Sequence, residues 1–145
     1  MKRIILIGKT GCGKTTLIQR IESGVIQYRK TQAVAYSDAF IDTPGEYVER
    51  RSLYRALIVT AADADVVGLV QGCSDELVCL PPQIASIFPK DVVGIVSKTD
   101  LADGPGEIAR AREVLELAGA ARIFELSALT GDGVGALAEY LEAPE

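Results

Sequence analysis

Short runs of consecutive apolar residues alternate with stretches in which apolar side chains recur every three or four positions, and this alternation continues to the end of the chain. The runs are typical of strands buried on both faces of a sheet, whereas the spaced stretches predict amphipathic helices. We expect strands at residues 2–7, 33–36, 39–41, 65–70, 91–96 and 122–126, and helices at 14–23, 51–61, 81–87, 105–118 and 134–141.

This order of elements predicts the α/β class, with one three-layer domain over residues 1–145. Its sheet is expected to have six strands, mostly parallel, with helices on both faces. Only Ser37 and Asp38 separate the second and third strands, so we expect a tight hairpin in which the second strand is short and antiparallel. Ligands of such sheets bind beyond the carboxyl ends of the strands, where the candidate motifs should therefore lie.

The composition narrows the classes of function. Hydrophobic residues make up 48% and charged residues 24% of the 145 positions, enough for one core in a soluble domain. The net charge of −5 argues against a nucleic-acid partner or an anionic membrane surface. The first apolar run is too short for a signal peptide, and none approaches the roughly 18 apolar residues of a membrane span. We therefore expect a cytoplasmic protein.

The most specific motif follows the first expected strand. Residues 8–15 read GKTGCGKT, which matches G-x-x-x-x-G-K-T between a strand and a helix. The backbone amides of such a P-loop and the start of its helix bind a polyphosphate. Lys14 would reach the β- and γ-phosphates and the hydroxyl of Thr15 would bind Mg²⁺. The expected phosphate-binding residues are Gly8, Lys9, Thr10, Gly11, Cys12, Gly13, Lys14, Thr15 and Thr16.

The cysteines and the missing histidines bear on the metal and on redox chemistry. The chain has three cysteines, Cys12, Cys73 and Cys79, which cannot all pair with one another and fit a reducing compartment. It has no histidine, so oxygen-bound Mg²⁺ is expected rather than zinc. Cys12 lies beside a helix N-terminus and Lys14, a setting that lowers a thiol pKa. The alternative, which we favour, is a thiol packed beneath the loop.

A second phosphate motif follows the third expected strand, where residues 42–45 read DTPG. Asp42 would hold Mg²⁺ through a water, and the Gly45 amide would donate to the γ-phosphate, which makes this loop a switch. Thr31, in the irregular segment before the second strand, is the best candidate for a further Mg²⁺ ligand, although Thr10 and Thr43 also lie near the expected phosphates. The expected metal ligands are Thr15, Thr31 and Asp42.

The ends of the fifth and sixth strands carry a candidate base-binding site. Residues 97–100 read SKTD. Asp100 would accept hydrogen bonds from guanine N1–H and N2–H₂, whereas adenine would leave it unpaired at a cost of about 1–3 kcal/mol. The aliphatic stem of Lys98 can cover the plane of the base. Ser127 and Ala128 follow the sixth strand, and the backbone amide of Ala128 would donate a hydrogen bond to guanine O6. The alternative for Asp100 is a helix N-cap.

The chain resembles the Ras-like P-loop GTPases over essentially its whole length, because it has four of their elements in the same order. These elements are the P-loop, the loop threonine Thr31, the DTPG motif and the base-binding motif SKTD, with Ser127 and Ala128 after it. Residues 28–34 (YRKTQAV), 41–47 (IDTPGEY) and 56–65 (ALIVTAADAD) resemble more closely the ethanolamine- and propanediol-utilization P-loop family (EutP/PduV). The resemblance implies a Ras-like domain that binds Mg²⁺ with GTP or GDP. It also implies a place in bacterial microcompartments, with a shell protein or pathway enzyme as the partner.

Two departures from the Ras-like pattern affect the expected activity. Ser97 stands where asparagine is common, and it would brace the P-loop more than it binds the base. Glu46 follows Gly45, where a glutamine commonly orients the attacking water, and its charge would repel the γ-phosphate. We therefore expect slow GTP hydrolysis. The residues expected to act in it are Lys14, Thr31, Gly45 and Glu46, while Arg29, Arg50 and Arg51 near the switches are interpreted as surface residues.

Two alternatives stay open at this point. The same phosphate-binding loop could transfer the γ-phosphoryl group to a short carboxylate such as acetate, although the sequence shows no dedicated acceptor pocket. A chain that binds GTP without hydrolysing it could serve as a docking module, although the intact Lys14, Thr15, Asp42 and Gly45 argue against an inactive site.

Overall fold

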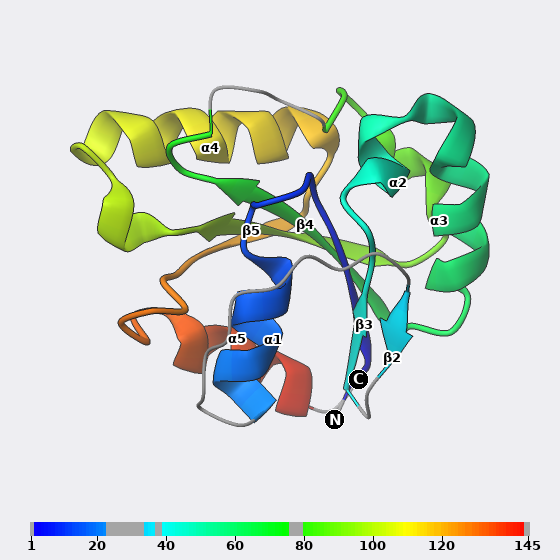
Figure 1. Cartoon of the computed structure of the whole chain (residues 1–145), viewed down its shortest axis with the longest axis horizontal. Coiled ribbons are helices and arrows are strands. Elements are labelled where there is room, and N and C mark those ends of the chain that lie inside the picture. Colours follow the sequence, from blue (N-terminus) through cyan, green and yellow to red (C-terminus); the bar gives the residue numbers. More distant parts are fainter. Residues whose placement is uncertain (1, 23–33, 37–38, 76–79, 144–145) are drawn as a thin grey trace.

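The computed structural model describes residues 2–22, 34–36, 39–75 and 80–143. In this part of the chain, helices cover both faces of a central sheet whose strands are mainly parallel (Figure 1). The α/β class and the parallel sheet flanked by helices that the sequence predicts are thereby confirmed. No helix in the described ranges combines the length and the apolar character needed to cross a bilayer.

The first strand lies in the interior of the sheet. Along the sheet the strand order is β2-β3-β1-β4-β5-β6. The strands span Ile4–Ile7 (β1), Ala35–Tyr36 (β2), Phe40–Asp42 (β3), Val66–Gly72 (β4), Asp91–Ser97 (β5) and Arg122–Glu125 (β6). β2 pairs antiparallel with β3, and the other strand pairings among the described residues are parallel. The carboxyl ends of β1, β3, β4, β5 and β6 therefore meet at one edge.

Two groups of helices cover the two faces (Figure 1). The helices span Lys14–Glu22 (α1), Glu46–Glu49 (α2), Tyr54–Ala61 (α3), Pro105–Ala118 (α4) and Val134–Glu142 (α5), with 3₁₀ turns at Arg51–Leu53 (η1), Ile84–Ile87 (η2) and Thr99–Leu101 (η3). α2, α3 and α4 lie on one face, and α1 and α5 on the other. α4 has the bounds predicted for it, with Pro105 in its first turn and Gly119 in the left-handed region at its end.

Two of the predicted helices differ from the observed elements. The helix expected at 81–87 is only the 3₁₀ turn η2, because Gln83 adopts a left-handed conformation with φ of 64° immediately before it. The backbone amide of Gln83 donates to Leu117 O at 2.8 Å, which fixes this bend against α4. The helix expected at 51–61 is divided into η1 and α3. The expected turn at Ser37 and Asp38 lies outside the described residues.

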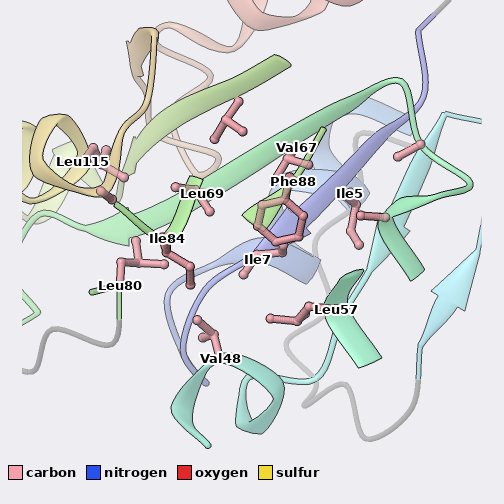
Figure 2. Close-up of a cluster of buried hydrophobic side chains, with 14 of the residues drawn as sticks. Ile5, Ile7, Val48, Leu57, Val67, Leu69, Leu80, Ile84, Phe88 and Leu115 are labelled. Carbon is pink, nitrogen blue, oxygen red and sulfur yellow. The ribbon is translucent and has the colours of Figure 1, made fainter. Parts of the chain in front are cut away.

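Two hydrophobic cores explain why the strands are apolar on both faces. Side chains alternate along a strand, so Ile5 and Ile7 enter the core beneath α2, α3 and α4 (Figure 2). Ile4 and Leu6 enter the second core, which α1 and α5 cover. All of these side chains are fully buried. β1 is therefore held from both faces and from both neighbouring strands, and it presents the residues after Ile7 at the carboxyl edge.

Candidate functional site

The P-loop wraps tightly over the end of β1 because three of its glycines permit it. A Cβ on Gly8 would lie 2.6 Å from both Val70 O and Cys12 Sγ, so only glycine fits there. Gly11 and Gly13 have φ values of 83° and 101°, which disfavour any other residue. The chain then enters α1 at Lys14. The close approach and the two left-handed residues give the turn its closed shape.

Lys14 points back beneath the loop. Its Nζ donates to Gly8 O at 2.6 Å and to Lys9 O at 3.1 Å, and the residue is only 5% exposed. The neighbouring Thr16 is half-buried on α1. A buried ammonium group held by loop carbonyls is a concentrated positive charge at the centre of the site, where an anion is expected to bind.

Cys12 is a buried thiol rather than a reactive one. The side chain is fully buried, and its Sγ accepts a hydrogen bond from Lys14 Nζ at 3.6 Å. Burial raises the pKa of the thiol above its ordinary value, and this effect exceeds the opposing attraction of Lys14. The hypothesis that the helix N-terminus and Lys14 lower this pKa is therefore wrong, because desolvation is the larger effect.

The side-chain oxygens of two residues lie together beside the P-loop. The hydroxyl of Thr15 donates to Asp42 Oδ2 at 2.5 Å, and Asp42 is only 4% exposed. A hydroxyl oxygen and a carboxylate oxygen are ligands that suit Mg²⁺, so Thr15 and Asp42 could hold this ion. No group of three or more potential His, Cys, Asp or Glu ligands occurs among the residues described. Thr31 lies outside the described residues.

The DTPG loop lies directly against the P-loop. A Cβ on Gly45 would fall 2.1 Å from Thr10 N and 2.3 Å from Thr10 Oγ1, so this close contact requires glycine. The hydroxyl of Thr10 donates to Glu49 Oε2 at 3.0 Å. The hydroxyl of Thr43 donates to Leu6 O at 2.7 Å, which turns it into the sheet and removes it as an alternative metal ligand. Glu46, the first residue of α2, is exposed.

The loop after β5 is tied to the P-loop by two side chains. Ser97 Oγ donates to Cys12 O at 2.5 Å, and Lys98 Nζ donates to Gly11 O. Lys98 has a φ of 59°, a left-handed conformation that is unfavourable for lysine and needs support from its surroundings. The thiol of Cys73 supplies part of that support, because it donates to Lys98 O at 2.9 Å. The side chain of Lys98 therefore lies beside the P-loop.

Asp100 is held by the loop that follows β6. Ser127 Oγ donates to Asp100 Oδ1 at 2.7 Å, and the amide of Thr99 donates to Leu126 O at 3.3 Å. The cap residue of η3 is Lys98, and no side chain caps this turn, so the alternative that Asp100 is a helix N-cap is wrong. Ala128, half-buried, comes directly after Ser127. The structure thus brings the base-binding candidates of two loops to one place.

Two acidic residues at the site were not predicted. Glu49 contacts the P-loop through Thr10, as described above. Asp75 Oδ1 lies 3.7 Å from Lys9 Nζ, while Asp75 Oδ2 accepts the Gly72 amide at 3.2 Å. Neither belongs to a motif, and the only sequence signal is that Asp75 follows closely after the carboxyl end of β4. The predicted Arg50 and Arg51 are exposed, and Arg29 lies outside the described residues.

The fold and this set of loops define a P-loop protein of the GTPase class. The chain belongs to the PduV-EutP family, described as "Ethanolamine utilisation - propanediol utilisation", whose model matches residues 1–143. This confirms the resemblance read from residues 28–34, 41–47 and 56–65.

Individual relatives agree with this assignment. The chain is 41% identical over 145 residues to "Propanediol utilization protein PduV" of Citrobacter freundii, covering 100% of this chain and 96% of the relative. It is 38% identical over 144 residues to "Probable acetate kinase EutP" of Escherichia coli K12, covering 97% and 89%. It is also 30% identical over 161 residues to "GTPase Era" of a Bradyrhizobium species, covering 97% of this chain and 52% of that protein.

Proposed function

We propose that this chain is a Mg²⁺-dependent GTP-binding protein that hydrolyses GTP slowly and serves propanediol or ethanolamine utilisation. The observation that supports this most directly is the pair of bonds from Ser97 to Cys12 and from Lys98 to Gly11. These bonds join a phosphate-binding loop to a candidate base-binding loop, as one ligand with a phosphate end and a base end requires.

The phosphate end would be bound by the P-loop amides from Thr10 to Thr16. Lys14, which is already buried in the loop, would neutralise charge on the β- and γ-phosphates. Thr15 and Asp42 would hold Mg²⁺, Asp42 through a water, and Thr31 is proposed as a further ligand. The metal would neutralise phosphate charge when bound.

The base end would be bound by Asp100, Lys98 and Ala128. The hydrogen bond from Ser127 to Asp100 Oδ1 orients the carboxylate. The lone pairs that this bond does not use would accept hydrogen bonds from guanine N1–H and N2–H₂. An adenine base would leave that carboxylate without donors, so guanine is preferred. Ser97, whose hydroxyl is used on the P-loop, would contribute to the shape of the pocket and not to reading the base.

The hydrolysis step would rest on positioning and charge neutralisation. Gly45 would donate its amide to the γ-phosphate, and Glu46, at the exposed start of α2, would be the nearest candidate to orient water. A carboxylate repels the transferred group, and the exposed Arg50 and Arg51 are not held toward the P-loop by any described contact. We therefore propose turnover on the scale of GTPases without a catalytic arginine, roughly 10⁻⁴–10⁻³ s⁻¹.

The direct experiment is titration of the protein with GTP, GDP and ATP in the presence of Mg²⁺, followed by measurement of phosphate release. The proposal expects tight binding of both guanine nucleotides, weak binding of ATP and slow release of phosphate from GTP. The variant Lys14→Ala should lose most of the affinity. Unchanged affinity in that variant, or equal binding of ATP and GTP, would contradict the proposal.

Carboxylate phosphorylation is a second candidate, because relatives with 38% identity carry the name "Probable acetate kinase EutP". The P-loop would bind the donor nucleotide in the same way, and a carboxylate oxygen would attack the γ-phosphorus in place of water. Incubation with labelled GTP or ATP, with and without acetate, separates the two reactions. Acyl phosphate that forms only with acetate would favour the kinase, whereas free phosphate at the same rate in both would favour the GTPase.

A docking module without hydrolysis is the remaining alternative, and a microcompartment shell protein or a pathway enzyme would be its partner. Single-turnover measurement on preloaded GTP distinguishes it. Tight binding with no phosphate release over hours would replace the GTPase proposal with this one.

A further inference from the structure

The side chain of Thr10 connects the P-loop to the segment that follows the DTPG motif. Its hydroxyl donates to Glu49 Oε2 at 3.0 Å. On the same side, the Gly45 backbone lies so close that a Cβ there would be 2.1 Å from Thr10 N. Gly45 and Glu49 are joined in turn, because the Glu49 amide donates to Gly45 O at 3.2 Å. Thr10 therefore contacts both ends of one short unit, which is α2 and the glycine before it.

This unit is also anchored in the core. Val48, between Tyr47 and Glu49 on α2, is 3% exposed and lies in the hydrophobic cluster beneath the sheet (Figure 2). Tyr47 packs against the same cluster. Because Val48 is buried in the core, a separation of the Gly45 backbone from Thr10 requires α2 to shift against that core.

The charge on Glu49 adds to this effect. A carboxylate at hydrogen-bond distance from a P-loop residue raises the energy of a nearby polyphosphate, and a triphosphate carries more negative charge than a diphosphate. Lys9 Nζ lies 3.7 Å from Asp75 Oδ1, and among the described residues no ion pair involves Glu49.

We propose that the contact of Thr10 with Glu49 and Gly45 sets the preference between nucleoside diphosphate and triphosphate. The inference rests on the proposed function, in which the Gly45 amide meets only a third phosphate. In the closed contact no group fits between Gly45 and Thr10, so a triphosphate has to separate them and break the bond to Glu49. A diphosphate does not. The contact thus lowers the affinity for the triphosphate selectively, since a ligand shifts an equilibrium only through its different affinity for the two states.

The experiment compares the dissociation constants for GDP and for a non-hydrolysable GTP analogue, each with Mg²⁺, by calorimetric titration. The variants are Thr10→Val, which keeps the shape but removes the hydroxyl, and Glu49→Gln, which removes the charge. We expect each to raise the affinity for the analogue relative to GDP by about fivefold, the scale of one hydrogen bond to a charged group at a partly exposed position. Glu113→Gln removes an equal charge from an exposed position of α4 and should leave the ratio unchanged.

The double variant tests whether the two residues act through one contact. If they do, Thr10→Val combined with Glu49→Gln should change the ratio no more than the larger single effect, because coupled changes are not additive. A ratio that stays at the wild-type value in both single variants overturns the inference, even where GDP and the analogue bind. Wild-type protein that binds neither nucleotide overturns the proposed function as well. Because ratios are compared, a general loss of phosphate affinity in Thr10→Val does not imitate the expected result.

Discussion

At the scale of single residues, the side chains around the site act mainly on backbone carbonyls. Ser97 and Lys98 donate to two consecutive carbonyls of the P-loop, and Thr43 donates to the carbonyl of Leu6. A carbonyl that is held from outside the loop cannot turn toward a phosphate, so these bonds restrict the conformation of the loop. The shape of the phosphate-binding loop thus depends on residues that need not touch the nucleotide.

Removal of the Ser97 hydroxyl tests this dependence. Ser97 is 3% exposed, so Ser97→Ala leaves the Cys12 carbonyl without its side-chain donor in a buried setting. We expect a loss of about 1–3 kcal/mol in the free energy of unfolding, measured by urea denaturation, together with weaker GDP binding. Ser86→Ala is the control, because Ser86 is an exposed serine that donates to a local carbonyl at 2.7 Å. Equal losses in both variants would show that Ser97 has no special role.

Exchange of one atom in Asp100 should change the base that is bound. The amide of Asp100→Asn can donate to the C2 carbonyl of xanthine, whereas it loses one acceptor for guanine. We expect the preference to move from GTP toward xanthosine triphosphate, measured by competition for the site. Ser127→Ala keeps the carboxylate but removes its 2.7 Å bond, and it should weaken guanine binding without changing the preferred base. An unaltered preference in Asp100→Asn would show that this carboxylate does not read the base.

The burial of Cys12 has a pH signature. Folding raises the pKa of this thiol, so the folded chain keeps the proton where the unfolded chain loses it. The associated stability is complete below the ordinary value of 9.0 and is lost as the pH rises beyond it. Urea denaturation at neutral pH and above 9.0 should show a steeper fall for the wild type than for Cys12→Ala. Parallel pH curves for the two proteins would exclude this contribution.

At the scale of elements, the contact between the P-loop and the DTPG loop depends on a glycine. Gly45→Ala places a Cβ 2.1 Å from Thr10 N, a backbone atom that cannot move aside cheaply. We expect a destabilisation of about 1–3 kcal/mol and a loss of phosphate release from GTP. Gly106→Ala is the matched control, because its Cβ would meet nothing within 4 Å and it lies in α4. That substitution should stabilise the protein by about 0.5–1 kcal/mol, which thermal unfolding would measure.

The pattern of hydrophobic positions predicts the elements well where an element packs into the cores along its whole length. β1, α4 and α5 follow this rule, and their observed positions agree closely with the expected ones. It fails at η2, because Pro81 and Pro82 can begin a helix but the left-handed Gln83 after them has no signal in the sequence. α2 was missed since its four residues are too few to show a period.

The sequence predicts the motif residues of the candidate site but not the contacts between separate elements. The motif residues that the structure describes do come together, because each follows the carboxyl end of a strand in a parallel sheet. The contacts of Thr10 with Glu49 and of Lys9 with Asp75 join separate elements, and no spacing along the chain predicts such pairs. Thr31 lies outside the described residues, so its proposed role stays a prediction.

At the scale of the whole molecule, ligand binding should be visible as stability. A ligand that binds only the folded state at 100 times its dissociation constant stabilises it by about 2.7 kcal/mol. For a chain of this length we expect GDP or GTP with Mg²⁺ to raise the melting temperature by about 5–10 °C. Chelation of Mg²⁺ should remove much of the increase for GTP, and Lys14→Ala should remove it for both nucleotides. An equal increase with ATP would contradict the proposed guanine preference.

The position of β1 determines how the site behaves when the protein fluctuates. Ile4–Ile7 pairs with β3 on one side and β4 on the other, and its side chains fill both cores. Amide protons on such a strand exchange with solvent only when the entire fold opens, whereas those near chain ends and surface loops exchange through local opening. The strand that carries the P-loop should therefore be among the slowest segments in deuterium exchange. The strand beneath the phosphate-binding loop thus stays in place until the molecule unfolds.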